Sequence, residues 1–308
     1  MNDTNTKKVL TWLQTAVERV REFAYTEPPP AAPPLERPRI GIALGGGFAR
    51  GIAHLGVLRV LEEENIPVDV VTGTSAGALL AISYASGHTL PEIERQAKAT
   101  RFKDFGNWKL SWMGLASNQK LEHYPRKFLG VSTFEDLKIP LAIAATDLAT
   151  GEAVYFSHGQ LGPALRASCA YPGMFVPVEI EGRMLVDGFL AAPVPVDAAR
   201  SIGADLVIAV FLEAANNRTP SSIVDVIGLS FAILQRHADL EWRARADIII
   251  EPMVKDFLWD DFEKTAELMA AGEAAARAAL PKIRAAIAGK TSPETSLVNS
   301  GTGLRERE

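Results

Sequence analysis

A serine in a short segment flanked by glycines is one of the residues of this sequence whose type and setting could do chemistry. Ser75 lies in Gly73-Thr74-Ser75-Ala76-Gly77, directly after a buried apolar run and directly before a helical pattern. A G-x-S-x-G nucleophile requires this strand–turn–helix setting, in which the glycines allow a sharp turn that exposes the hydroxyl. The helix that follows directs its free N–H groups and the positive end of its dipole to the same place. An N-cap serine in an ordinary strand–helix turn is the alternative.

Three consecutive glycines, Gly45, Gly46 and Gly47, form a second candidate site between an apolar run and a helical pattern. Their backbone N–H groups could converge on an anion, since no side chain obstructs them. A nucleotide phosphate is one such anion, but the acid of a dinucleotide fingerprint and the Lys-Ser/Thr ending of a nucleotide loop are both missing. The oxyanion of a tetrahedral acyl intermediate needs the same donors beside a nucleophile. The serine elbow after the next strand favours the oxyanion over the phosphate.

Asp187 is the candidate base. A serine nucleophile needs a group that takes its proton, and no histidine of this chain follows a strand in the manner of a triad base. The histidines, interpreted as structural residues of helices or loops, are His54, His88, His123, His158 and His237. The pair Asp187-Gly188 instead stands at the end of a short apolar strand. An acid therefore takes the place of a histidine in this interpretation.

The elements that must position these residues alternate between β-branched apolar runs and helical patterns. The predicted strands are residues 39–44, 68–72, 140–146, 204–210 and 246–251. The predicted helices are residues 51–64, 76–86, 195–203, about 221–241 and an Ala-rich segment at about 262–287. Such alternation predicts an α/β fold in which helices cover both faces of a largely parallel sheet.

Three segments are expected along the chain. Residues 1–38 combine an amphipathic helical pattern with a Pro-rich run, which favours an extended spacer. This first segment either packs on the protein or on a partner subunit, or lies on a membrane surface. Residues 39–288 form the catalytic domain, and the polar tail 289–308 is expected to be disordered.

Composition limits the partners and the location. A formal net charge of -5 gives no basic stripe for nucleic acid. The single cysteine, Cys169, fits a reducing compartment, and no apolar run reaches the roughly 20 residues that span a bilayer. We therefore expect a cytoplasmic protein that could touch membranes peripherally, with a homo-oligomer allowed. No cluster of acids and histidines has metal-ligand spacing, so neither a metal nor a cofactor is expected.

Four blocks of the sequence resemble the bacterial patatin-like phospholipases over roughly residues 39–250. In chain order the blocks are LGGGFARGIAHLGVLRVLEE, GTSAGA, ATDLATGEAVYFSHGQLGPALRASCAYPGMFVPV and LVDGFLAAPVPVDAARSIGADLVIAV. The resemblance implies a three-layer α/β/α sandwich and a Ser–Asp dyad that cleaves carboxylic esters of lipids through an acyl-enzyme. It further implies that Ser75 is the nucleophile and Asp187 the base. The implied oxyanion hole comprises Gly45, Gly46, Gly47 and Phe48, with Arg50 bracing it.

Two residues depart from the family pattern, and these departures allow a non-catalytic protein as an alternative. Phe48 and Phe189 stand where the family usually has a small residue, and a bulky side chain at position 48 restricts the backbone of the oxyanion loop. An acyltransferase that uses the same acyl-enzyme is one alternative, and a non-catalytic lipid-binding protein is another. The aromatic segment 101–119 could be a lid or interfacial loop over a lipid site, or could pack on the core.

Overall fold

The computed structural model describes residues 37–291 apart from 102–103, 105, 214–218, 221–222 and 239. The chain divides into two units, Met1–Glu36 and Arg37–Glu308. The predicted N-terminal helix and most of the Pro-rich run lie outside the described residues, as does the tail from residue 292. The predicted end of the domain at residue 288 falls inside the last helix, because the chain continues as a helix through Gly289.

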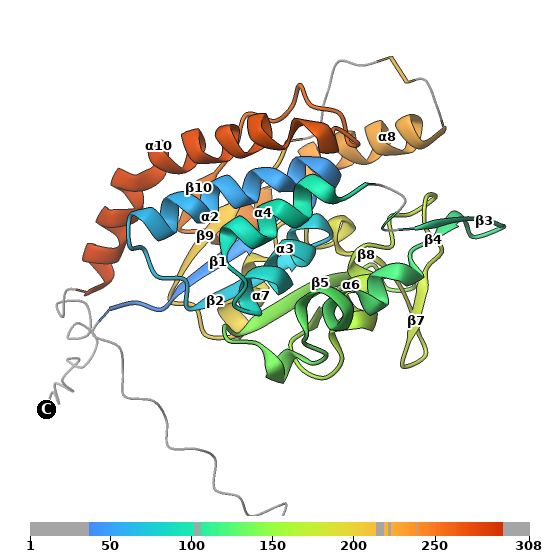
Figure 1. Cartoon of the computed structure of the whole chain (residues 1–308), viewed down its shortest axis with the longest axis horizontal. Coiled ribbons are helices and arrows are strands. Elements are labelled where there is room, and N and C mark those ends of the chain that lie inside the picture. The colour runs from blue at the N-terminus through green and yellow to red at the C-terminus, as the bar shows by residue number, and fades with distance from the viewer. Residues whose placement is uncertain are drawn as a thin grey trace, which may run out of the picture. The chain divides into compact units, whose positions relative to one another are not determined.

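The second unit is built on one mixed sheet (Figure 1). Its parallel strands are β1 (Ile40–Leu44), β2 (Val70–Thr74), β5 (Leu141–Asp147), β9 (Leu206–Val210) and β10 (Ile248–Ile250). Its antiparallel strands are β6 (Ala153–Phe156), β7 (Val178–Ile180) and β8 (Arg183–Asp187). The strand order is β10-β9-β1-β2-β5-β8-β7, with β6 also paired to β5. A separate two-stranded hairpin is formed by β3 (Asn107–Ser111) and β4 (Gly114–Ser117).

Helices cover both faces of this sheet. One face packs against α2 (Ala53–Glu63), α3 (Ala76–Ala85), α6 (Leu161–Ser168) and α10 (Thr265–Thr291), with α4 (Leu90–Ala99) outside α2 and α3. The other face packs against α7 (Val196–Ser201) and α9 (Leu240–Arg245), while α8 (Ile223–Ala238) lies beside the carboxyl ends of the strands. In β1, Ile40, Ile42 and Leu44 face the first layer and Ala43 faces the second. The predicted three-layer α/β fold with a mostly parallel sheet is confirmed.

Two helices of the first layer approach unusually closely through glycines. A Cβ atom on Gly272 of α10 would lie only 1.9 Å from the Ala53 carbonyl oxygen of α2. A Cβ atom on Gly56 of α2 would lie 2.0 Å from the Met269 carbonyl oxygen of α10. The backbones of α2 and α10 therefore touch, and Figure 1 shows α10 running along α2.

The structure contains elements that the periodicity does not predict. The antiparallel strands β6 and β7 are short and only partly buried, so they lack the continuous apolar run of the parallel strands. The short apolar strand predicted before Asp187 is present as β8. Helix α4 buries only Leu90 and Ile93, although its Thr89/Glu92 capping box marks its beginning. The predicted helical stretch near 221–241 is two helices, α8 and α9.

Candidate active site

Ser75 occupies a strained turn between β2 and α3. Its φ of 55° and ψ of -120° lie outside the regions that residues with a Cβ atom favour. The flanking glycines are required by close approach: a Cβ atom on Gly77 would lie 2.2 Å from the Leu44 carbonyl oxygen, and one on Gly73 would lie 2.5 Å from Ala78. The predicted strand–turn–helix setting of Ser75 is therefore present.

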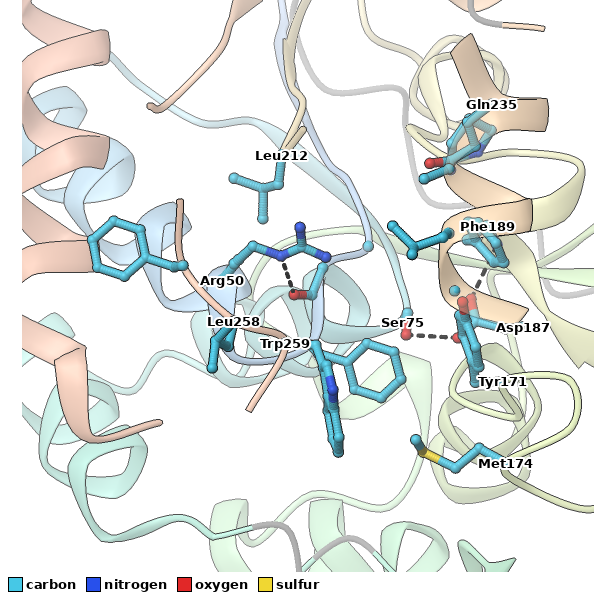
Figure 2. Close-up of a pocket in the computed structure, with 18 of the residues that line it drawn as sticks. Arg50, Ser75, Tyr171, Met174, Asp187, Phe189, Leu212, Gln235, Leu258 and Trp259 are labelled. Carbon is cyan, nitrogen blue, oxygen red and sulfur yellow. Dashed lines mark hydrogen bonds between the residues drawn. The ribbon is translucent and has the colours of Figure 1, made fainter. Parts of the chain in front are cut away.

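The Ser75 hydroxyl donates a hydrogen bond of 2.7 Å to Oδ2 of Asp187 (Figure 2). Sheet pairing explains how residues 112 positions apart meet. Strand β5 extends beyond the end of β2, where Ala144 pairs with Thr74 and Ala145 pairs with Asp187. The antiparallel β8 thus returns along this extension and ends level with the serine.

Asp187 is 1% exposed and is held through both its backbone and its carboxylate. Its Oδ1 accepts the Phe189 N–H at 3.0 Å, and its carbonyl accepts the Thr146 hydroxyl at 2.9 Å. Burial raises the pKa of Asp187 to about 7, although the hydrogen bonds from Ser75 and Phe189 act to lower it. A carboxylate with this pKa can accept a proton from a neighbouring hydroxyl near neutral pH.

The last residue of α6 and the segment that follows it contact both residues of this pair. The Ser168 hydroxyl accepts the Ser75 backbone N–H at 2.8 Å, and the Ala170 carbonyl accepts the Asp187 N–H at 3.0 Å. Nothing in the local pattern of Ser168 or Ala170 marks either of them as a site residue. Only the resemblance of the block that contains ASCAYPG could have pointed to them.

Two of the glycine-loop amides already have backbone partners. The Gly45 N–H donates to the Val210 carbonyl at 3.0 Å, and the Gly46 N–H donates to the Pro193 carbonyl at 3.3 Å. These bonds fix the beginning of the loop to the end of β9 and to the segment after Asp187. Gly45 and Gly46 therefore serve mainly to place the loop.

The next two amides of the loop, those of Gly47 and Phe48, make no hydrogen bond to another described residue. They lie beside the serine, since a Cβ atom on the preceding Gly46 would be 3.4 Å from the Ser75 Cβ. The N–H of Ala76, the first residue of α3, belongs to the helix N-terminus, whose first amides have no intrahelical partner. The loop and the helix can thus offer donors to an anion at Ser75.

Phe48 has a left-handed backbone in this loop, with φ of 51°. This conformation favours glycine and costs a residue with a Cβ atom roughly 1–2 kcal/mol. The ring packs edge-on against Tyr171 and Trp259, with centroid distances of 5.1 Å and 5.6 Å. Aromatic packing on both sides offsets part of the backbone cost.

Arg50 and His54 brace the loop from inside the protein. The Arg50 Nε donates to the Gly47 carbonyl at 3.3 Å, and its Nη1 donates to the Glu213 carbonyl at 3.2 Å. Burial lowers the pKa of Arg50 to about 10, which leaves it cationic at neutral pH. Burial also lowers the pKa of His54 to about 4, so the imidazole is neutral, and its Nε2 lies 2.8 Å from the Gly45 carbonyl oxygen. The predicted structural role of His54 fits this geometry.

A cavity opens over the Ser75–Asp187 pair. Its lining includes six of the predicted site residues, namely Gly46, Gly47, Phe48, Arg50, Ser75 and Asp187, whereas Gly45 is not among the lining residues. Phe189 forms part of its wall, where its ring stacks on Tyr171 at a centroid distance of 5.3 Å. The second unexpected phenylalanine therefore shapes the cavity without displacing the reacting groups.

Within the described ranges, no three His, Cys, Asp or Glu side chains are grouped so that they could hold a metal ion. The expectation that the chemistry needs no metal stays a prediction. Among the same residues, no helix is both long enough and apolar enough to cross a membrane.

The model of the patatin-like phospholipase family matches residues 42–200, just over half of the chain. The chain therefore belongs to the patatin-like phospholipase family, and the resemblance seen in the sequence is confirmed. The match includes Ser75, Asp187 and the glycine loop.

Curated relatives share this region and are longer. An uncharacterized NTE family protein of Mycobacterium tuberculosis is 37% identical over 178 residues, which cover 57% of this chain and 49% of the relative. Lysophospholipase NTE1 of Saccharomyces cerevisiae is 32% identical over 203 residues, which cover 64% of this chain and 12% of the relative. The chain thus matches half or less of the length of these relatives.

A solved structure shares the fold. VipD from Legionella pneumophila superposes with a TM-score of 0.52 at 14% sequence identity, covering 80% of this chain and 67% of that chain. At this level of identity the likeness concerns the fold alone.

Proposed function

We propose that this chain hydrolyses carboxylic esters of lipids through a Ser75–Asp187 dyad. The observation that carries the proposal is the 2.7 Å hydrogen bond from the Ser75 hydroxyl to the buried Asp187 carboxylate, beneath a cavity with aromatic walls. Membership of the patatin-like phospholipase family and the name of the yeast relative, a lysophospholipase, support the same class of reaction.

In the proposed mechanism Asp187 takes the hydroxyl proton while the Ser75 oxygen attacks the ester carbonyl. The N–H groups of Gly47 and Phe48 and the start of α3 stabilise the oxyanion, and the Arg50 cation adds to this field. Asp187 then gives its proton to the leaving alcohol. Water attacks the acyl-enzyme with Asp187 again as base, which releases the carboxylic acid and restores the serine.

Turnover of a short-chain chromogenic ester tests this proposal. We expect Ser75→Ala to lower turnover by at least about 10⁴-fold, because no other group can carry the acyl intermediate. Ser201→Ala, the same substitution on α7, removes only a hydroxyl bonded to the Ala198 carbonyl and should retain turnover. A folded Ser75→Ala protein with turnover near that of wild type would refute the proposal. Absence of turnover in wild type itself would favour the non-catalytic lipid-binding alternative.

Transfer of the acyl group to an alcohol is the competing reaction of the same intermediate. Including glycerol or a lysolipid in the assay would divert the acyl group to a new ester if the chain is a transferase. Hydrolysis predicts that free fatty acid remains the main product under these conditions.

We further propose that the protein meets its substrate at a membrane surface. Large apolar side chains are exposed on two elements that lie toward the same end of the body in Figure 1. Trp112 at the β3–β4 turn is fully exposed, and the large apolar residues exposed on the described part of α8 include Val226, Ile233 and Leu234. Helix α8 also lines the cavity over Ser75 through Leu229 and Ala232. Contact of these exposed side chains with a membrane surface would bring the cavity over Ser75 close to the lipid. Trp112→Asp should weaken sedimentation with vesicles while sparing turnover of a soluble ester.

A further inference from the structure

A second cavity also reaches Ser75, from the side of the first helical layer. It runs between α3 and α4 and is lined by one face of each helix. From α3 come Ala76, Leu79 and Leu80, and from α4 come Ile93 and Ala97. Residues spaced three and four apart share a helix face, so the two helices form facing apolar walls.

Among the described residues that line this second cavity, none is an acid, a lysine, an arginine or a histidine. The hydroxyls of Thr100 and Tyr124 in its lining are already bonded to Gln96. The Thr100 hydroxyl donates to the Gln96 carbonyl at 2.8 Å, and the Tyr124 hydroxyl donates to Gln96 Oε1 at 3.1 Å. A mainly apolar cavity whose hydroxyl groups are bonded to protein suits a hydrocarbon chain and leaves a charged group unsolvated.

The first cavity differs in charge. Its lining includes Arg50, Asp187 and Asp225, so it can accept polar groups and water. Ser75 and Phe48 line both cavities. An ester bound at the serine can therefore send one of its two arms into each cavity.

The proposed reaction decides which arm enters which cavity. Asp187 must pass its proton to the alcohol oxygen and must later take a proton from the attacking water. Asp187 lines the first cavity and does not line the second. The alcohol and the water must therefore approach from the first cavity, which leaves the second for the acyl arm.

We propose that the cavity between α3 and α4 holds the hydrocarbon chain of the acyl group, and that its length sets the acyl-chain preference of the enzyme. This inference rests on the proposed hydrolysis at Ser75. It assigns medium or long fatty acyl esters as the preferred substrates, with the head group in the cavity over Asp187.

The test compares two equivalent substitutions. Leu79→Trp adds bulk to the proposed acyl cavity, and Leu229→Trp adds the same bulk to the cavity over Asp187; both leucines are half-buried helix residues. The measurement is kcat/KM for the para-nitrophenyl butyrate, octanoate and dodecanoate esters. Each buried methylene favours binding by roughly fourfold, so exclusion of about three methylenes should lower the dodecanoate-to-butyrate ratio by about 60-fold in Leu79→Trp. Leu229→Trp should leave this ratio within about threefold of wild type.

Circular dichroism checks that each variant is folded. If Leu79→Trp does not fold, Ala97→Phe takes its place, since it fills the same cavity from α4. If a folded variant that fills the α3–α4 cavity keeps the wild-type dodecanoate-to-butyrate ratio, this inference is overturned and the proposed hydrolysis at Ser75 is not affected. A ratio that falls only in Leu229→Trp would place the acyl chain in the other cavity. If the wild-type protein cleaves no ester of the series, the proposed hydrolysis is refuted, and this inference is refuted with it.

Discussion

At the scale of single residues, the site depends on how Asp187 is solvated. The carboxylate is excluded from water, which disfavours its charge, and it receives hydrogen bonds from Ser75 and Phe189, which favour it. Burial is the larger effect, and the pKa rises to about 7. Such a carboxylate has a proton affinity nearer to that of an imidazole than an exposed aspartate has, which would let it act without a histidine.

The pH dependence of hydrolysis follows from this shift. The deprotonated form of Asp187 is the base, so kcat/KM should fall about tenfold per pH unit below about 7 and level off above it. Hydrolysis of a soluble ester across a pH series, in buffers of constant ionic strength, measures this profile. A kcat/KM that stays constant down to about pH 5 would mean that the base titrates as an ordinary aspartate.

The types of Ser75 and Asp187 and their local setting were enough to predict these two residues of the site. Ser75 and Asp187 each stand at the end of an apolar run beside glycine, a local signal that the sequence contains. The support from Ser168 and Thr146 could not be predicted in this way. Their hydrogen bonds join segments whose proximity is set by the tertiary fold.

At the scale of elements, the sequence predicted the parallel strands and most helices because each is a continuous apolar run or a clear helical pattern. It could not predict that β8 runs antiparallel to β5. The pairing of Ala145 with Asp187 depends on long-range register, which a short strand does not reveal. The position of the carboxylate beside the serine is a consequence of that register.

The contact between α2 and α10 gives a prediction at this scale. Alanine normally stabilises a helix interior by roughly 1 kcal/mol relative to glycine. Gly272→Ala should instead lower the free energy of unfolding by at least about 1–3 kcal/mol, because its methyl group would overlap the Ala53 carbonyl. Chemical denaturation monitored by circular dichroism measures the change.

Gly289→Ala is the control for this prediction. It lies in the same helix, is exposed, and has no atom within 4 Å of the position that a Cβ atom would take. We expect this variant to be as stable as wild type or slightly more stable. Equal stability of Gly272→Ala and Gly289→Ala would show that α2 and α10 are not in backbone contact.

At the scale of the whole molecule, the buried carboxylate has a cost in stability. The folded pKa of Asp187 lies above its unfolded value of about 3.9, so the folded protein holds a proton that the unfolded chain releases. The contribution of Asp187 to the free energy of unfolding therefore falls as pH rises from about 4 to about 7 and is constant above about 7.

Asp187→Asn should remove this penalty. The variant should have a free energy of unfolding close to that of wild type at about pH 4 and should exceed it by as much as about 4 kcal/mol above about pH 7. Urea denaturation of both proteins at several pH values measures the difference. A difference that does not change with pH would mean that Asp187 is already ionised in the folded protein throughout this range.

The central claim is that Asp187, and no histidine, activates Ser75. The most direct measurement is turnover of one soluble ester by folded Asp187→Asn and by His→Ala variants of all five histidines. Asparagine keeps the size of the side chain but cannot take the proton, so turnover should fall by about 10²–10⁴-fold or more.

The histidine variants should each retain turnover, with a loss of at most about tenfold for His54→Ala, which removes a donor to the Gly45 carbonyl. Turnover of Asp187→Asn within a few-fold of wild type would contradict the assignment of Asp187 as the base. A loss of activity in any folded His→Ala variant as large as that of Ser75→Ala would equally contradict it.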